Sequence, residues 1–436
     1  MNFKKEGVMK KLWAPQDQTF WYLKRGAIAP CREDMKADVV IIGGGMAGLS
    51  AAQAFHKRGK KVVLLEQYYC GSGATGKSSG FITPNAEISF TDFSKIYTKD
   101  SAHAIWDFIT SGVNDIRSNI QHYSFACDYD PQDTLIVATS KKGLKNLEIE
   151  QHNLSEYGYK TSFYSAESVK DHIGSDAYFG GMTYGDTFGI DAYRYCQELK
   201  KHLQSQGVHI FEETPVTDLN DHTVTTAHAT LTADYIVVCT DRFLPELGRL
   251  KKEVYHAQTF LMISQQLRNE QVAAIFPREK WMVWDTDLIY NYFRLTGDNR
   301  LLLGGGSVLT TYSSQPDHNN RYMLKKLTQY FQKKFPGLDI QFEQMWPGLI
   351  GLSKDIAPIA GPDKDNNTIY YIAASAGLPI AAALGRYSAE HLLDGNREFD
   401  TYFYPYRKFP IGGIAQSILG TKLSFALSNF LKANIP

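Results

Sequence analysis

Ten residues, Gly71 to Gly80, combine small side chains, hydroxyl groups and one lysine, a composition typical of a loop that binds phosphate. The first eight match the P-loop pattern of enzymes that use nucleoside triphosphates. A P-loop follows a strand directly and opens a helix. Here Gln67 to Cys70 intervene before the loop, and Gly80 and Pro84 discourage a helix after it. We therefore favour another role for this small-residue loop. The alternative is ATP binding, in which Asp241, at the end of a later strand, would bind the metal ion.

A second glycine-rich stretch lies just upstream, within Ala37 to Gln67. An apolar run predicts a strand, which leads directly into Gly43, Gly45 and Gly48 at the spacing GxGxxG; a helix and a second strand ending at Glu66 follow. These glycines permit a tight turn, a close approach to pyrophosphate and helix–strand packing, and the acid accepts hydrogen bonds from a ribose diol. The stretch therefore predicts a dinucleotide-binding βαβ unit.

One feature decides which dinucleotide this unit holds. The fingerprint is the one complete example in the sequence, since Gly304 to Gly306 lacks the third spaced glycine. A single dinucleotide is thus favoured over a flavin and nicotinamide pair. The small-residue loop can offer amides and hydroxyls to a distant part of a long cofactor. We therefore predict FAD, whose isoalloxazine ring lies well beyond its pyrophosphate.

Four motifs together resemble the FAD-dependent D-amino-acid-oxidase-like family. They are the fingerprint, the small-residue loop, Asp285 to Gly306, and Met345 to Asp363. The resemblance spans roughly Phe20 to Gly395. It is nearest to the bacterial branch typified by gamma-glutamylputrescine oxidoreductase.

The resemblance implies FAD contacts from segments far apart in the chain. The matching positions are Gly43, Gly45, Met46, Ala47, Gly48, Glu66, Gln67, Ser72, Gly73, Thr75, Ser78, Ser79, Gly80, Val216, Thr240, Gly377, Leu378, Pro379 and Ile380. In the family, the late flavin loop has a glycine pair around a polar residue, and Leu378 and Pro379 depart from this pattern. The departure leaves open the alternative that the chain binds flavin without catalysing a reaction. All five cysteines precede residue 240, so the late cysteine linkage of some relatives is absent and we expect non-covalent FAD.

Composition limits the partners and the compartment. The 436 residues carry no formal net charge and no basic run, which argues against nucleic acid as the main partner. Five scattered cysteines suggest a reducing compartment and no metal site. The sequence lacks the apolar region of a signal peptide and any run long enough to span a membrane. We expect a cytoplasmic enzyme, with attachment to the inner face of the membrane as the alternative.

The order of expected elements predicts an α/β fold with an α+β substrate part. We expect a Rossmann-like FAD-binding domain and a discontinuous substrate domain on a mixed sheet, as in D-amino-acid oxidases and glutathione reductases. The predicted parts are an N-terminal extension (1–36), the FAD-binding domain (37–92, 172–250 and 345–398), the substrate domain (93–171 and 251–344) and a C-terminal tail (399–436).

The implied reaction oxidises the C–N bond of an amine or amino acid to an imine. A flavin takes a hydride from the carbon next to nitrogen when the amine is neutral and that carbon lies over the ring, so the protein mainly positions the substrate. A gamma-glutamylated polyamine or a secondary amino acid is the leading substrate on the resemblance alone. Oxygen is the expected acceptor, with release of hydrogen peroxide.

Candidate substrate residues lie in the segment YNYFRLT. Strand alternation places Tyr290, Tyr292 and Arg294 on one face, where the arginine offers a fork to a carboxylate and the tyrosines flank an amine. The alternative is a surface arginine beside half-buried tyrosines. Trp346 could pack over the site and His256 could accept a proton, although residues of both kinds are more often structural.

The C-terminal tail carries apolar residues near helical spacing, with lysines away from that stripe. The stripe consists of Ile414, Ile418, Leu423, Leu427 and Leu431. Such an amphipathic helix docks on its own domain or lies in a membrane surface. In the second case the flavin would pass its electrons to quinone rather than oxygen.

Overall fold

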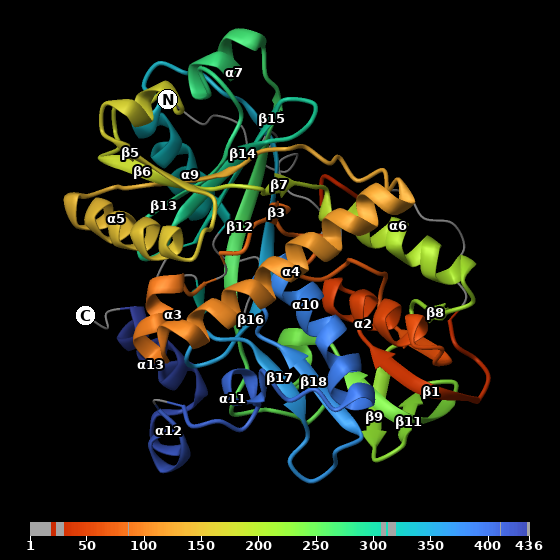
Figure 1. Cartoon of the computed structure of the whole chain (residues 1–436). Coiled ribbons are helices and arrows are strands. Elements are labelled where there is room, and N and C mark those ends of the chain that lie inside the picture. Colours follow the sequence, from red (N-terminus) through yellow and green to blue (C-terminus); the bar gives the residue numbers. More distant parts are fainter. Residues whose placement is uncertain are drawn as a thin grey trace.

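Two sheets organise the chain (Figure 1). The computed structural model describes residues 19–22, 30–85, 87–306, 311–312, 320–409 and 411–433. The first sheet has the order β17-β18-β11-β1-β2-β8, with β10 and β9 added beside β11. Its strands are β1 (Met35–Ile42), β2 (Val62–Leu65), β8 (His209–Phe211), β9 (Val216–Asn220), β10 (Thr223–Thr226), β11 (Thr230–Val238), β17 (Ile359–Pro362) and β18 (Ile369–Ala373).

The centre of this sheet is parallel and covered by helices. Strand β1 pairs in parallel with β2 and β11, and its apolar residues Val39 to Ile42 are buried, as expected for a strand enclosed on both faces. The nearby helices are α2 (Met46–Lys57), α4 (Lys99–Tyr123), α6 (Ala192–Ser205) and α10 (Leu378–Ala389).

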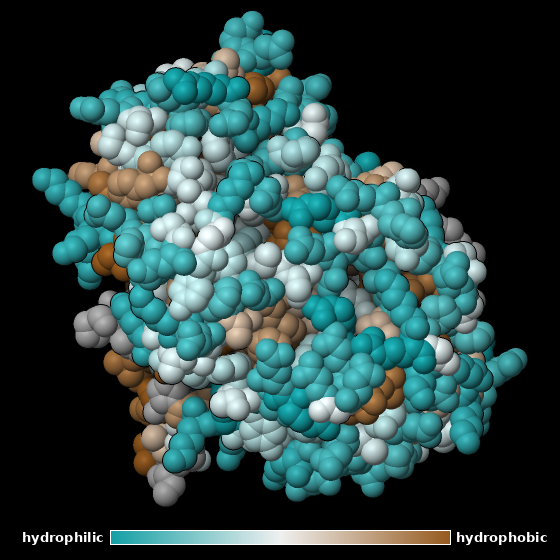
Figure 2. All heavy atoms as spheres, in the orientation of Figure 1, coloured by the Kyte–Doolittle hydropathy of each residue, from teal (hydrophilic) through white to brown (hydrophobic). Residues whose placement is uncertain are grey.

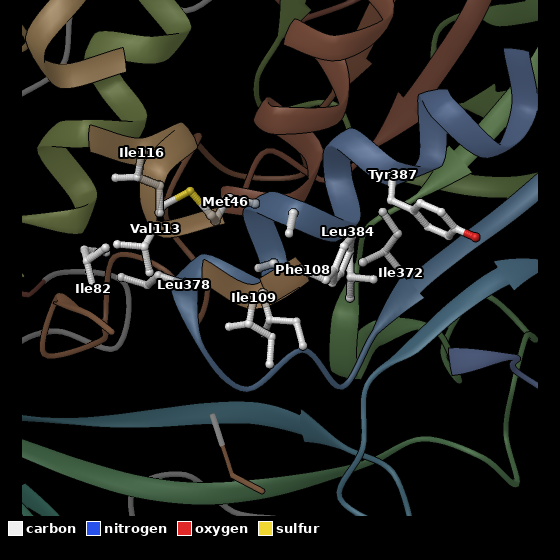
Figure 3. Close-up of a cluster of buried hydrophobic side chains, with 14 of the residues drawn as sticks. Met46, Ile82, Phe108, Ile109, Val113, Ile116, Ile372, Leu378, Leu384 and Tyr387 are labelled. Carbon is white, nitrogen blue, oxygen red and sulfur yellow. The ribbon is translucent and has the colours of Figure 1, made fainter. Parts of the chain in front are cut away.

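Close packing of α2, α4 and α10 depends on two glycines. A Cβ on Gly112 of α4 would overlap the Pro379 carbonyl, and a Cβ on Gly385 of α10 would overlap the Ala47 carbonyl. Figure 3 shows apolar side chains of the three helices meeting, among them Phe108. The N-terminus of α2 is thereby packed against the middle of α10, and the N-terminus of α10 against α4.

The second sheet is mixed and has the order β16-β12-β15-β14-β13-β4-β6-β5. Its strands are β4 (Thr134–Val137), β5 (Thr161–Ser165), β6 (Gly180–Tyr184), β12 (Tyr255–Gln266), β13 (Met282–Asp285), β14 (Asn291–Leu295), β15 (Arg300–Gly305) and β16 (Phe342–Leu352). Its pairs are antiparallel apart from β4 with β13. Phe293, Phe331 and Phe335 pack together beneath it and join α9 (Asn320–Lys334) to the sheet.

Shorter elements connect the sheets. They are β3 (Phe81–Ile82), α3 (Phe90–Ile96), α5 (Lys141–Glu156), η1 (Ser168–Asp171), β7 (Phe188–Gly189), η2 (Asp241–Phe243), α7 (Asn269–Ile275), η3 (Glu390–Asp394), α11 (Asp400–Phe403), α12 (Gly413–Leu419) and α13 (Thr421–Ala433). Strands β3 and β7 form a two-stranded ribbon against which Arg294 of β14 packs.

The architecture confirms the predicted α/β class, with a Rossmann-like parallel part and a mixed second sheet. Two strands fall outside the predicted division of the chain. Strands β6 and β16 lie in the second sheet, although the ranges 172–250 and 345–398 were predicted to belong to the FAD-binding part. The reason is pairing over a long distance: β16 follows β12 along most of its length, and β6 lies between β4 and β5.

In the described part of the C-terminal tail, the short helix α11 is followed by α12 and α13, which are separated by Gly420, whose φ of 75° breaks the helical path. The docked face of the tail is largely polar. The Asn429 amide donates to the carbonyls of Ser353 and Lys354 (3.0 Å each), and the Phe425 ring packs on Tyr255.

The predicted apolar stripe of the tail points outward. Ile418 is 80% exposed, and Leu423, Leu427 and Leu431 are exposed as well, forming the brown area over α12 and α13 in Figure 2. The side chain of Ile414 lies outside the described residues. Among the described helices, none is long and apolar enough to cross a bilayer.

Candidate cofactor and substrate site

A large cavity lies between the two sheets, and both contribute to its walls. Its volume is about 1620 Å³. Pockets for one drug-sized ligand usually measure about 300–1,000 Å³. The cavity can therefore hold a long cofactor and a substrate together.

The glycine turn between β1 and α2 forms one end of the cavity. Gly43 has a φ of 107°, which is unfavourable for side-chain-bearing residues, and a Cβ on Gly48 would overlap the Gly43 carbonyl. Gly43, Gly45, Met46 and Ala47 line the cavity, whereas Gly48 lies behind them and lets α2 pack against the turn. The turn thus presents backbone N–H groups at a helix N-terminus, as a pyrophosphate requires.

Glu66 and Gln67 follow β2 and also line the cavity. The two Glu66 carboxylate oxygens accept hydrogen bonds from the Gly44 N–H (2.7 Å) and the Tyr68 N–H (2.9 Å). Burial raises the pKa of Glu66, and these N–H donors oppose the shift. Because a carboxylate oxygen can accept a second hydrogen bond, Glu66 can hold the turn and still accept from a ribose diol.

The small-residue loop is a series of turns that leads into β3, with no helix after it. The structure therefore disagrees with the P-loop alternative. The Thr75 hydroxyl accepts from the Met46 N–H (3.1 Å) and ties the loop to α2. Ser72, Gly73, Thr75, Ser78 and Ser79 line the cavity, and Gly80 packs against the Ile190 carbonyl instead.

The glycine turn, Glu66 and the small-residue loop form one side of the cofactor-binding part of the cavity, which we call the cradle. Its opposite side comes from later segments of the chain. Val216 and Thr240 line the cavity, and the Thr240 hydroxyl oxygen is buried without a hydrogen-bond partner among the described residues. Gly377, Leu378 and Pro379 line it at the N-terminus of α10, while Ile380 is buried away from it.

Asp241 is a cradle residue whose role the sequence did not indicate. Its carboxylate accepts from the Gly351 N–H (2.6 Å) and the Ala374 N–H (2.9 Å), and so joins β11 to the ends of β16 and β18. Burial raises its pKa, and these N–H groups oppose the shift. The acid considered above as a metal ligand is thus engaged by backbone amides.

The substrate end of the cavity is lined by a wall of four aromatic rings, Phe81, Trp284, Tyr290 and Tyr292. Neighbouring ring centroids lie 5.8 to 6.4 Å apart. Gly304, opposite Tyr292 in the β14–β15 pair, leaves room for the Tyr292 ring, since a Cβ there would overlap it. Tyr292 therefore lies where the sequence placed it, on the cavity wall.

Arg294 does not reach the cavity. It is fully buried, and its guanidinium donates to the carbonyls of Ser79 (2.7 Å), Ile190 (2.7 Å) and Leu295 (3.0 Å). Burial lowers its pKa to about 10. The structure disagrees with the predicted carboxylate fork, because the β3–β7 ribbon covers this part of the strand face; Arg294 instead positions the small-residue loop.

Trp346 and His256 also lie outside the cavity lining. Trp346 is buried beside Trp21, and its indole N–H donates to the Lys77 carbonyl (3.1 Å). His256 lies on β12 opposite Gly351, with its ring stacked on Tyr255. Both residues lie behind the residues that line the cavity. The structure therefore disagrees with the prediction that they contact the substrate.

The donors and shape of the cradle fit FAD. The glycine turn offers a pyrophosphate site, Glu66 a ribose acceptor and Thr240 a hydroxyl without a described partner. The small-residue loop then leads from this end to the aromatic wall through Phe81. The five cysteines are free thiols, and Cys239 lines the cavity.

Comparison with known proteins agrees with this interpretation. The model of a family described as FAD dependent oxidoreductase matches residues 38–391. Gamma-glutamylputrescine oxidoreductase of Escherichia coli (strain K12) is 29% identical over 393 residues, 87% of this chain and 89% of that protein. These matches confirm the predicted family and cofactor class.

Two solved structures share the fold. L-proline dehydrogenase from P. horikoshii aligns with a TM-score of 0.73 and 19% identity, over 86% of this chain and 98% of its own. Glycine oxidase from Geobacillus kaustophilus aligns with a TM-score of 0.73 and 16% identity, over 86% of this chain and 99% of its own.

Proposed function

Because the chain belongs to the FAD dependent oxidoreductase family, we propose that it oxidises the C–N bond of an amine to an imine, which water then hydrolyses. When bound, FAD supplies the acceptor for the hydride that leaves the carbon next to nitrogen. The nitrogen loses the balancing proton, and oxygen then takes the two electrons and two protons as hydrogen peroxide. A gamma-glutamylputrescine-like compound or a secondary amine is the proposed substrate.

The observation that carries the proposal is the continuity of the cavity. It extends from the glycine turn of β1 and α2 to the aromatic wall of the second sheet, so a dinucleotide and an organic substrate share one continuous cavity. The likeness to gamma-glutamylputrescine oxidoreductase supports an amine over an alcohol.

The residues of this chain would act mainly by positioning. No histidine lines the cavity in the part of the chain that the structure describes, and Glu150 and Asp285 are engaged by backbone N–H groups, so the amine would enter neutral and release its N–H proton to water. The aromatic wall would exclude water from the reacting carbon. Burial raises the pKa of Tyr292, which keeps its hydroxyl neutral as a hydrogen-bond donor.

The test is the visible spectrum of the purified protein under anaerobic conditions, before and after addition of amines and amino acids. We expect yellow protein whose flavin absorbance is bleached by an amine, with peroxide formed when air is admitted. Protein that holds FAD and is bleached by no compound would favour the non-catalytic alternative. Protein that cannot be reconstituted with FAD would contradict the assignment.

The exposed tail favours a second candidate function, a dehydrogenase bound peripherally to a membrane with quinone as its acceptor. Residues 405–436 contain four basic and no acidic residues, which suits an anionic lipid surface. Ile418, Leu423 and Leu431 project outward beside Lys422, the arrangement of an interfacial helix. Lys422 and Leu427 of α13 also border the cavity.

Sedimentation with anionic phospholipid vesicles tests this candidate. We expect the protein to bind them. The combined variant Ile418→Ser, Leu423→Ser and Leu431→Ser should bind roughly 100-fold or more weakly, because each of the three apolar side chains contributes about 1 kcal/mol or more when buried. Tyr322→Ser, at an exposed position of α9, is the matched control. Equal binding of all three proteins would exclude the tail as a membrane contact.

A further inference from the structure

One carboxylate of the substrate end has few partners. Glu87 lines the cavity, and its side chain is exposed to it. Its Oε1 accepts a hydrogen bond from the Tyr290 hydroxyl (2.8 Å). Among the described residues, no cation acts on this carboxylate, whose one side-chain partner is Tyr290. It can therefore accept a positively charged partner from the cavity.

The other carboxylates at this end are already engaged. Glu150 accepts from the Phe90 N–H (3.0 Å) and the Thr91 N–H (2.8 Å). Asp285 accepts from the Asn291 N–H (3.2 Å), and Asp287 accepts from a threonine hydroxyl (2.7 Å). Unlike Glu150 and Asp285, Glu87 accepts no hydrogen bond from a described backbone N–H group, and unlike Asp287 it is bonded to a hydroxyl of the aromatic wall, that of Tyr290.

The charge of the cavity favours a cation. Its described lining holds eight acidic and four basic residues. The acids are Glu66, Glu87, Asp92, Glu150, Asp241, Glu246, Asp285 and Asp287, and the bases are Lys77, Lys95, Arg242 and Lys422. Since Arg294 is engaged elsewhere, no arginine of β14 offsets the acids near the aromatic wall.

The aromatic wall adds a second attraction for a cation. Tyr290, which donates to Glu87, lies beside Tyr292 and Trp284 with ring centroids 5.8 and 6.4 Å away. The faces of such rings attract ammonium groups, and their apolar surface accommodates a carbon chain. The wall continues to Phe81, at the end of the small-residue loop.

We propose that Glu87 and the aromatic wall bind a second, positively charged nitrogen of the substrate, distinct from the nitrogen whose C–N bond is oxidised. The inference rests on the proposed amine oxidation. A carboxylate and ring faces favour the protonated amine, whereas hydride transfer needs a neutral one, so a single nitrogen cannot occupy both places. The substrate class is therefore a diamine or a longer molecule in which an apolar chain separates two nitrogens.

Surrounding protein atoms raise the pKa of Glu87, and no cation contributes to that shift. A bound ammonium would stabilise the carboxylate and reverse the shift. Tyr290 would remain a neutral donor to Glu87, since burial raises its pKa well above the ordinary value.

The test compares 1,4-diaminobutane with butylamine, which lacks the second nitrogen. Anaerobic flavin bleaching gives kcat/KM, and calorimetry gives equilibrium binding of each amine to the holoprotein. We expect Glu87→Gln to lower kcat/KM and affinity for the diamine about 10- to 100-fold and to leave butylamine unchanged, since a charged hydrogen bond is lost. Glu156→Gln removes one charge from the exposed face of α5, outside the cavity, and should change neither.

Two results would overturn the inference. One is an equal effect of Glu87→Gln on both amines, and the other is diamine binding that the substitution does not weaken. If neither amine bleaches the flavin of the unchanged protein, the wider panel of amines and amino acids decides the proposed oxidation. Calorimetric binding of the diamine, and its loss in Glu87→Gln, still decides the charged-nitrogen site in that case.

Discussion

Purified Gly48→Val protein is expected to contain no FAD. A side chain at this position overlaps the Gly43 carbonyl, so α2 must move away from the turn that holds the pyrophosphate. Overpacking alone costs about 1–3 kcal/mol, roughly 5- to 150-fold in affinity, and displacement of the N–H donors adds to it. The visible spectrum and the FAD released on denaturation measure the loss.

Gly59→Asn is the matched control for this substitution, because it alters the glycine after the other end of α2. Gly59 has a φ of 75°, which asparagine tolerates, and a Cβ there has no atom within 4 Å. We expect this variant to be yellow. Gly48→Val protein with a full complement of FAD would show that the turn does not hold the cofactor.

Asp241→Asn is expected to destabilise the protein by about 2–4 kcal/mol and to weaken FAD retention. The substitution keeps the size of the side chain and tolerance of its positive φ, 49°. An amide, however, has one oxygen for the two backbone N–H groups of Gly351 and Ala374, so one donor faces an NH₂ group. Urea unfolding at saturating FAD, together with the FAD content, measures both effects.

Asp394→Asn provides the comparison for Asp241. Asp394 pairs with Arg58 at 2.7 Å, but its side chain is half exposed, and such pairs contribute about 0–1 kcal/mol. A similar loss of stability in both variants would mean that the Asp241 bonds do not hold the two sheets together.

Local patterns in the sequence were sufficient to predict the first half of the site. The GxGxxG turn and Glu66 lie within one βαβ unit, so their geometry follows from chain-local rules. For Arg294, such chain-local rules gave the wrong prediction. Strand alternation put it on the same face as Tyr292, but the β3–β7 ribbon that covers it comes from distant parts of the chain.

Asp241 and Glu87 could not have been assigned from sequence for the same reason. Each lies outside a strand or long helix, so no periodicity marks its direction. Their roles arise from partners about 110 to 200 residues away, Gly351 for Asp241 and Tyr290 for Glu87. The tail differs, since periodicity predicted its helix but not which face docks; polar bonds from Asn429 decide that.

The position of β1 in its sheet has a consequence for synthesis on the ribosome. Its neighbour β11 begins at Thr230, and the cradle is completed by α10 near residue 378. At about 5–20 residues per second, β1 is synthesised roughly 10–40 s before this neighbour. During that time its apolar side chains and unpaired backbone groups are exposed, and a chaperone can cover them. Because the cradle needs α10, we expect FAD to stabilise the chain only after translation has passed that helix.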